Sequence, residues 1–147
     1  MPAGEFQVET YSVSHGRTAA GPRAALVLRA ADSAGLRDTA QLLFSPSTGA
    51  FSGMADNIGS SSAAVQVFAD LPYADFAPMY DLVRNEAPVR LWYEYAAGST
   101  PTNPLDFLGI LSNSNERPGE GPADSDALQA LVRLQTEGPP IDKHLRR

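Results

Sequence analysis

Residues able to perform nucleophilic or acid–base chemistry are sparse in this chain. Its 147 residues include no cysteine and two histidines, His15 and His144, which stand near opposite ends of the sequence. The G-x-S-x-G motif of serine hydrolases and the glycine-rich phosphate-binding motifs are missing. We therefore expect no catalytic residue, no cofactor and no metal site, and we predict that the protein is not an enzyme.

Oxygen ligands are concentrated in one polar segment, residues 113–126 (NSNERPGEGPADSD). Calcium takes carboxylate and amide oxygens at regular positions of an EF-hand loop, with glycine at the sixth position. Counted from Asn113, the fifth and sixth positions are Arg117 and Pro118, so the pattern fails there. We expect residues 112–123 to form a solvated loop, with calcium binding or ordering on binding a partner left as an alternative.

Paired carboxylates are the next candidates, because two acids in one pocket can divide acid and base roles. Glu94 and Asp106 lie in the two most apolar predicted strands and would face each other if those strands form a hairpin. Arg90 lies on the same strand face as Glu94. The simpler interpretation is a surface ion pair, worth about 0–1 kcal/mol.

Aromatic residues give the clearest functional indication. Eight of the twelve lie between residues 68 and 107. Tyr93 and Tyr95 share one face of a predicted strand, which suits a core or a pocket wall. Trp92 lies on the other face between Arg90 and Glu94, and Trp, Tyr and Arg dominate binding hot spots. We predict a binding surface formed by these five residues, the alternative being that Trp92 is covered by a second layer.

The elements that must position these residues follow from hydrophobic periodicity. Alternating or continuous apolar runs predict strands, and apolar residues three and four positions apart predict helices. Asp75 is a candidate N-cap, and Pro88 limits the first helix to about residue 85. Residues 15–23 read as a flexible loop. The predicted strands are 6–14, 24–29, 38–44, 50–54, 63–70, 89–95 and 105–111, and the predicted helices are 73–86 and 124–135.

This order of elements predicts an α+β fold. We expect a mostly antiparallel β-sheet or sandwich of about six to seven strands with two packed helices. The strand–helix–strand unit at residues 63–95 is a candidate parallel crossover. Residues 1–135 are expected to form a single domain, and residues 136–147 a flexible C-terminal tail.

Charge and composition restrict the partners. The net charge is −6 and the sequence pI is about 4.7, whereas nucleic-acid-binding domains usually carry a basic patch. No apolar run reaches the roughly 18 residues of a membrane span. Met1 to Val13 lacks the basic and apolar regions of a signal peptide. We expect a cytoplasmic protein that binds neither nucleic acid nor membrane, and the preference for arginine over lysine suggests a bacterial, GC-rich genome.

Two functions remain compatible with the sequence. The first is a non-catalytic protein-interaction or assembly module, whose aromatic strand face binds a protein partner or a second copy in a homo-oligomer. The alternative is a small-ligand-binding domain or an unrecognised hydrolase, with a pocket between the sheet and the 73–86 helix. Residues that would line this pocket are Tyr73, Tyr80, Tyr93, Tyr95 and Asp106.

Overall fold

The structure is a computed structural model that describes residues 2–46, 49–97 and 102–112. These residues form eight strands, a short 3-10 helix and one α-helix. The strands are β1 (Ala3–Gln7), β2 (Thr10–Thr18), β3 (Gly21–Arg29), β4 (Thr39–Ser45), β5 (Ser52–Asp56), β6 (Gln66–Pro72), β7 (Val89–Tyr95) and β8 (Thr102–Ser112); the helices are η1 (Tyr73–Asp75) and α1 (Phe76–Asn85).

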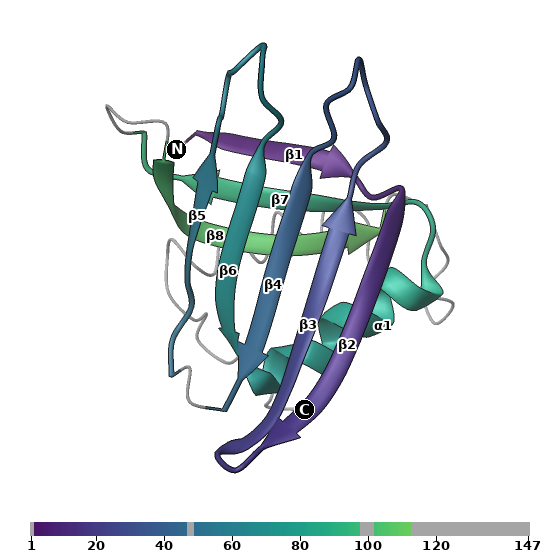
Figure 1. The fold of residues 1–147 in the computed structure, drawn as a ribbon, viewed down its shortest axis with the longest axis vertical. Coiled ribbons are helices and arrows are strands. Elements are labelled where there is room, and N and C mark those ends of the chain that lie inside the picture. Colours follow the sequence, from purple (N-terminus) through teal and green to yellow (C-terminus); the bar gives the residue numbers. More distant parts are fainter. Residues whose placement is uncertain (1, 47–48, 98–101, 113–147) are drawn as a thin grey trace, which may run out of the picture.

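All eight strands belong to one sheet, in the order β1-β7-β8-β5-β6-β4-β3-β2. β4 and β6 pair in parallel and every other neighbouring pair is antiparallel. The sheet curls into a half-barrel, so β1, β7 and β8 cross behind the other five strands (Figure 1). β8 connects these two layers, because residues 102–104 pair with β5 and residues 105–112 pair with β7.

Alternation of side chains produces the core between the layers. Along β3 and β4 every second residue is buried, and the residues between them face outward. A strand turns successive side chains to opposite faces, so this pattern commits one face of each strand to the core. The largest fully buried hydrophobic side chains are Leu26, Leu28, Leu42, Phe44, Val67 and Leu91.

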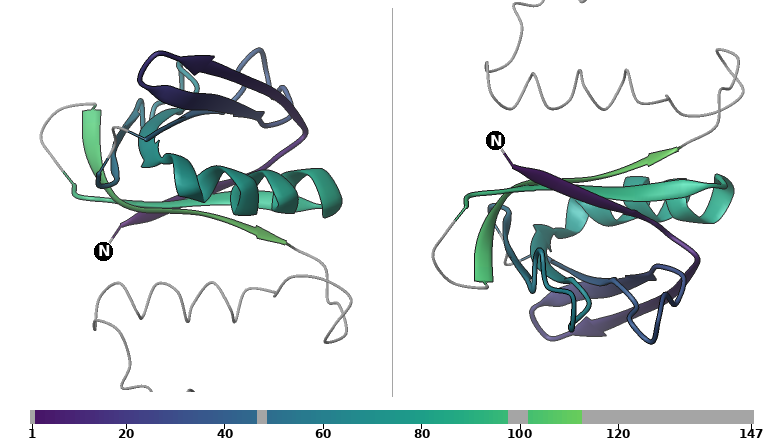
Figure 2. Two further views of the ribbon diagram at one scale, coloured as in Figure 1. Left: turned by 90° about the horizontal axis from the view of Figure 1, so that it is seen from below. Right: turned by 90° about the horizontal axis from the view of Figure 1, so that it is seen from above.

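α1 lies between the two layers, beneath the β2–β3 hairpin (Figure 2). Its apolar residues recur at helical spacing, and Val83 is buried while Phe76, Met79 and Tyr80 pack against the core. Pro78 is accommodated in the first turn, where a proline costs no helical hydrogen bond. The helix predicted at 73–86 is confirmed, although Asp75 makes no side-chain capping hydrogen bond.

The predicted fold class is wrong in the number of strands and in the number of packed helices. The chain forms one curled eight-stranded sheet rather than six to seven strands, and one α-helix rather than two occurs in the described residues. The sheet is mostly antiparallel, as predicted, and the β4–β6 pair makes it mixed. The predicted helix at 124–135, the loop at 112–123 and the tail at 136–147 lie almost entirely outside those residues. The predicted crossover at 63–95 is also wrong, because β6 pairs with β4 and β5, whereas β7 pairs with β1 and β8.

The N-terminal third contains the extra strand. The predicted strand at 6–14 is two strands, because the chain turns from one layer to the other at Val8 and Glu9. The Val8 N–H donates to the Val89 carbonyl of β7, and the Glu9 N–H donates to the Arg29 carbonyl of β3. Most of the predicted loop at 15–23 belongs to the β2–β3 hairpin. Its polar residues form a strand because pairing with β3 satisfies their backbone groups.

No helix in the described parts of the chain is long and apolar enough to cross a membrane.

Neighbouring leucines on β4 test the alternation of buried and outward-facing side chains along this strand. Leu42 is 0% exposed and Leu43 is 51% exposed. We predict that Leu42→Ala lowers the free energy of unfolding by about 2–5 kcal/mol, because it leaves a cavity in the core. Leu43→Ala, the matched control, should change it by less than about 0.5 kcal/mol. Urea denaturation measures both, and equal losses would contradict the assigned faces.

Candidate functional site

The residues predicted to bind a partner lie on β7, in the layer formed by β1, β7 and β8. Arg90, Trp92 and Glu94 alternate with Leu91 and Tyr93, so the first three face away from the core. Trp92 is half-buried and Glu94 is 7% exposed. The sequence correctly placed these three residues on one face, but it gave no measure of how far each is exposed.

Polar groups of this β7 surface bond within the chain. The Arg90 Nη1 atom donates to Oε1 of Glu5 on β1 at 2.8 Å, and the Trp92 indole Nε1 donates to Oε2 of Glu94 at 3.2 Å. Arg90 therefore forms its ion pair with Glu5, and the predicted partner, Glu94, instead accepts the indole hydrogen bond. Arg90 Nε is buried without a hydrogen-bond partner.

Glu94 and Asp106 do not face each other. In the β7–β8 pair Glu94 stands opposite Phe107 and Tyr95 stands opposite Leu105, with an irregularity between these pairs. Asp106 falls in that irregularity and is exposed, whereas Glu94 is buried. The hairpin itself was predicted correctly, but a one-residue irregularity is not visible in the apolar pattern.

Tyr93 points into the half-barrel, against the N-terminal strand. A Cβ atom on Gly4 would lie 2.4 Å from the Tyr93 hydroxyl, so only glycine fits beside this ring. Tyr93 is 4% exposed, and burial, followed by the charge of Asp38, raises its pKa to about 12. The Tyr95 ring lies beside it, with the centroids 6.2 Å apart. This pair is part of the core of the β7 layer.

The raised pKa of Tyr93 predicts a loss of stability at high pH. The unfolded chain releases this proton near the ordinary tyrosine pKa of 10, while the folded chain holds it up to about 12. Stability should therefore fall as the pH rises from 10 towards 12. Ultraviolet titration of the five tyrosines should show one phenol ionising near pH 12. Tyr93→Phe should remove it; if that late ionisation persists in the variant, the assignment is wrong.

The single tryptophan allows a test of the β7 surface. Trp92→Phe keeps an aromatic ring but removes the donor to the buried Glu94 carboxylate. We predict that unfolding free energy falls by about 1–3 kcal/mol, the cost of leaving a buried polar group without its partner. Chemical denaturation followed by circular dichroism measures this loss. Trp92→Phe combined with Glu94→Leu should recover part of it, whereas additive losses would rule out the coupling.

A second group of aromatic residues lies between β2 and α1. His15 Nε2 and the Tyr73 hydroxyl form a hydrogen bond, and the His15 ring contacts Phe76. Tyr11 packs edge-on against Tyr80, with the centroids 6.3 Å apart. The Arg84 guanidinium lies over the Tyr80 ring at 5.1 Å. The sequence missed this cluster because His15 was assigned to a loop.

The five residues predicted to line a pocket therefore fall into separate groups. Tyr73 and Tyr80 contact β2 residues, Tyr93 and Tyr95 contact each other on β7, and Asp106 is exposed on β8.

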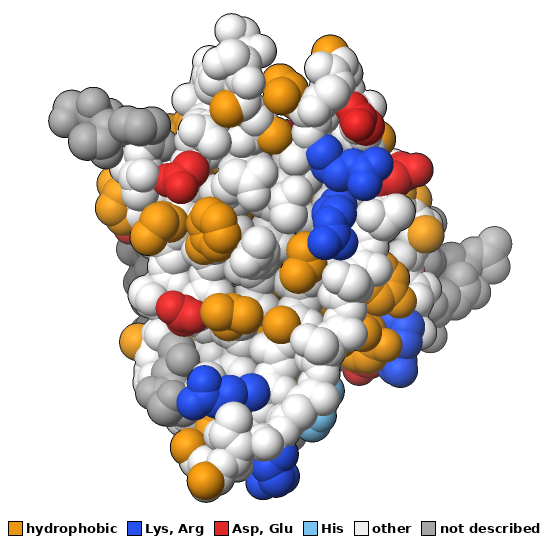
Figure 3. Space-filling view, in the orientation of Figure 1, with side chains coloured by type: hydrophobic (Ala, Val, Ile, Leu, Met, Phe, Trp, Pro, Cys, Tyr) orange, Lys and Arg blue, Asp and Glu red, His pale blue; other side chains and the backbone are white. Residues whose placement is uncertain are grey.

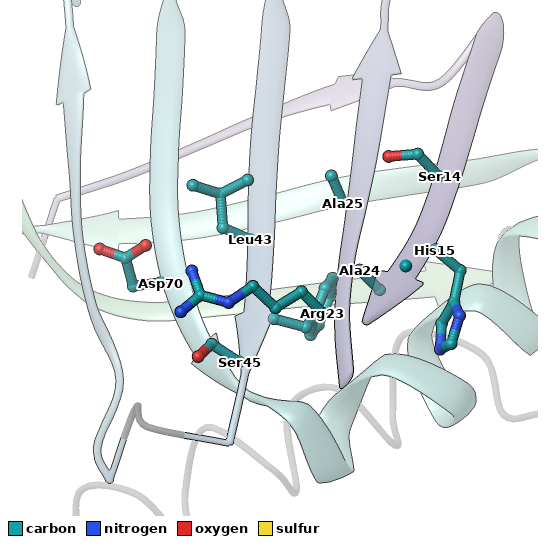
Figure 4. A pocket seen from close by; sticks show the side chains of 10 residues that line it. Ser14, His15, Arg23, Ala24, Ala25, Leu43, Ser45 and Asp70 are labelled. Atoms are coloured by element: carbon teal, nitrogen blue, oxygen red, sulfur yellow. The ribbon is translucent and has the colours of Figure 1, made fainter. Parts of the chain in front are cut away.

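Two hollows open elsewhere, on the outer face of the five-stranded layer. The larger, of about 600 Å³, is lined by residues of β2, β3, β4 and β6, and the smaller, of about 280 Å³, by residues of β4, β5 and β6. In the larger hollow the Arg23 side chain extends across the strands past Ser45 towards Asp70 (Figure 4). Leu43 lines both hollows.

Apolar and polar side chains both surround these hollows. Leu43 is 51% and Met54 is 42% exposed, and the space-filling view shows separate apolar patches with charged groups around them (Figure 3). The neighbouring outward residues Val27 and Phe68 are half-buried. The outer face is therefore mixed in character rather than a continuous apolar surface.

β2 is the most exposed element of the fold. All nine of its residues are exposed, and Tyr11 and Val13 are each 39% exposed although they stand opposite the buried Leu28 and Leu26 and face the core side. β2 ends the sheet, so β3 is its one strand neighbour among the described residues. The backbone groups along its other side have no strand partner in this part of the chain.

Within the described residues, no group of three or more His, Asp or Glu side chains is arranged to hold a metal ion. Comparison with known proteins finds no matching family model, no matching curated protein and no matching solved structure.

Proposed function

We propose that this chain is a non-catalytic protein-interaction or assembly module that binds a partner by strand addition at the free edge of β2. The observation that carries the proposal is the exposure of β2 along all nine residues. In an antiparallel pair every second residue turns its N–H and C=O away from the partner strand. β2 therefore presents an outward row of donors and acceptors along roughly 30 Å.

Such an edge favours a strand as its partner. Proteins usually blunt long edge strands with lysine, proline or a bulge, because an open edge pairs with other chains. β2 (TYSVSHGRT) contains no lysine and no proline, and its pairing with β3 runs without a bulge. In strand addition, backbone hydrogen bonds supply affinity and alternate side chains supply specificity. Tyr11 and Val13 are suitable side chains for that second role.

The β7 surface supports an interaction role less directly. Arg90 and Trp92 already donate hydrogen bonds to Glu5 and Glu94 of the same chain. A partner there would have to replace these bonds or bind the remaining surface of Trp92. We therefore place the principal contact at β2 and treat Trp92→Ala as a secondary test, expected to leave binding at β2 unchanged.

One observation supports the alternative function, a small-ligand-binding domain. The larger outer-face hollow has a volume of about 600 Å³, and Arg23, Ser45 and Asp70 supply polar groups. This volume lies within the range of about 300–1,000 Å³ typical of ligand sites. The hollow lies on the outer face, so it is a different site from the pocket expected between the sheet and the helix.

A displayed library of nine-residue peptides tests strand addition without knowledge of the natural partner. Peptides selected on the full chain should have alternating, strand-forming sequences. The edge is blocked by Ser12→Pro and, separately, Val13→Pro. Neighbouring residues turn their N–H groups to opposite sides, so one of the two variants keeps the pairing with β3 and blocks only the outer side. That folded variant should bind the selected peptides at least tenfold more weakly, as measured by fluorescence anisotropy.

Ser61→Pro, in the exposed loop after β5, is the matched control and should bind like the unmodified chain. Circular dichroism identifies which edge variant remains folded. Unchanged peptide affinity in that variant would disprove binding at β2. If Arg23→Ala weakened peptide binding and the edge variant did not, the outer-face hollow would be the site.

A further inference from the structure

We infer that the partner strand at β2 is β2 of a second copy of this chain, paired antiparallel about a two-fold axis that passes between the two copies of Ser14. The inference rests on the proposed function, and it adds the identity of the partner and the register. It follows from aligning the nine residues of β2 antiparallel to the same nine residues of a second copy.

Symmetry restricts the registers available. A two-fold axis perpendicular to the sheet keeps both faces in place, so each residue must oppose one that faces the same way. The axis therefore passes midway between the two copies of one residue of β2. Only an axis at Ser14, the central residue, pairs the full length of Thr10–Thr18.

This register gives complementary pairs on the core side. Tyr11 stands opposite Arg17 of the partner subunit, and Val13 stands opposite His15 of the partner subunit. An arginine beside an aromatic ring is a favourable cation–π pair. β2 carries no acidic residue, and this arrangement keeps its two Arg17 side chains at opposite ends of the contact. Like charges therefore do not face each other across the new strand pair.

The outer side of the same contact carries small residues. Ser14 stands opposite Ser14 of the partner subunit, and Ser12 stands opposite Gly16 of the partner subunit. A Cβ atom on Gly16 would meet nothing within 4 Å, so the outer face of β2 is uncrowded at this point. Neighbouring strands lie about 4.8 Å apart, and no bulky side chain on this side prevents that approach.

Pairing of β2 with β2 of a second copy fits this edge better than pairing of β2 with β1 of a second copy. β1, at that end, has five residues, and Phe6 within it is buried. Pairing β1 with β2 would leave part of the nine-residue edge uncovered. The two-fold contact uses one surface twice and closes on itself. Because it consists of a single strand pair, it belongs to the small end of interface sizes, and we expect a reversible dimer.

Disulfide trapping tests the register directly, because the chain has no cysteine of its own. Ser14→Cys places one thiol on the proposed axis. Opposed residues of antiparallel strands have Cα atoms about 4.5–5.5 Å apart, within the range of about 4.4–6.8 Å for a disulfide. Mild oxidation should therefore convert Ser14→Cys to a covalent dimer on a non-reducing gel.

Ser12→Cys is the matched control, on the same strand and the same face. In the proposed register its two copies are displaced by four residues, roughly 13 Å, and it should cross-link at least tenfold more slowly. The double variant Ser12→Cys with Gly16→Cys should again cross-link rapidly. Unchanged thermal unfolding of each reduced variant establishes that the folds are comparable.

Each contrary outcome has a separate meaning. Equal cross-linking of Ser14→Cys and Ser12→Cys would indicate random collision and overturn the inference. Faster cross-linking of Val13→Cys would place the axis at Val13 and overturn the register. A monomer by light scattering at several hundred micromolar, with no cross-link, would exclude a second copy. If the edge-blocked proline variant still loses peptide binding in that case, strand addition at β2 stands and only the second copy is excluded.

Discussion

The fold depends on β8 having two different partners. Its first three residues pair with β5 and the rest of the strand pairs with β7, so one strand belongs to both layers. The junction is tightly packed, because a Cβ atom on Gly53 would lie 2.6 Å from the Phe68 carbonyl oxygen and 2.9 Å from Leu105 Cδ1. This shared strand forces the sheet to curl, and the curl encloses a single core. On the opposite side the chain turns between layers at Val8 and Glu9.

The same curl explains why an edge remains open. A barrel removes its edges by pairing the first and last strands. Here β1 and β2 end the sheet and are not paired with each other, although they are consecutive in the chain. α1 packs between the layers and contributes Phe76, Met79 and Tyr80 to the core from that side. The core is thus completed by a helix rather than by a strand pair, and among the described residues the outer edge of β2 has no strand partner.

Polar side chains are used differently in the two layers. On β7, Arg90 and Trp92 bond to carboxylates of the same chain, which stabilises the layer. On the five-stranded layer, Arg23 extends over an open hollow and β2 is exposed throughout. The aromatic cluster of His15, Tyr73 and Phe76 supports β2 from below. The edge proposed to bind a partner therefore lies on a strand already ordered by its pairing with β3 and by these contacts, which would lower the entropic cost of binding.

The sequence by itself determined the elements whose periodicity is strong. The apolar alternation of residues 38–44 and 89–95 and the helical spacing of Phe76, Met79, Tyr80 and Val83 each reflect burial of one face, so the correct element follows. β2 has such a pattern only in its first half, where Tyr11 and Val13 alternate with polar residues, and residues 15–18 were predicted as part of a loop. Its strand conformation comes from hydrogen bonding to β3, as does the neighbour relation that brings His15 to Tyr73. Only the tertiary structure determined the edge strands and the parallel β4–β6 pair. Both depend on pairing between segments that are distant in the sequence, and such pairing leaves no local periodicity.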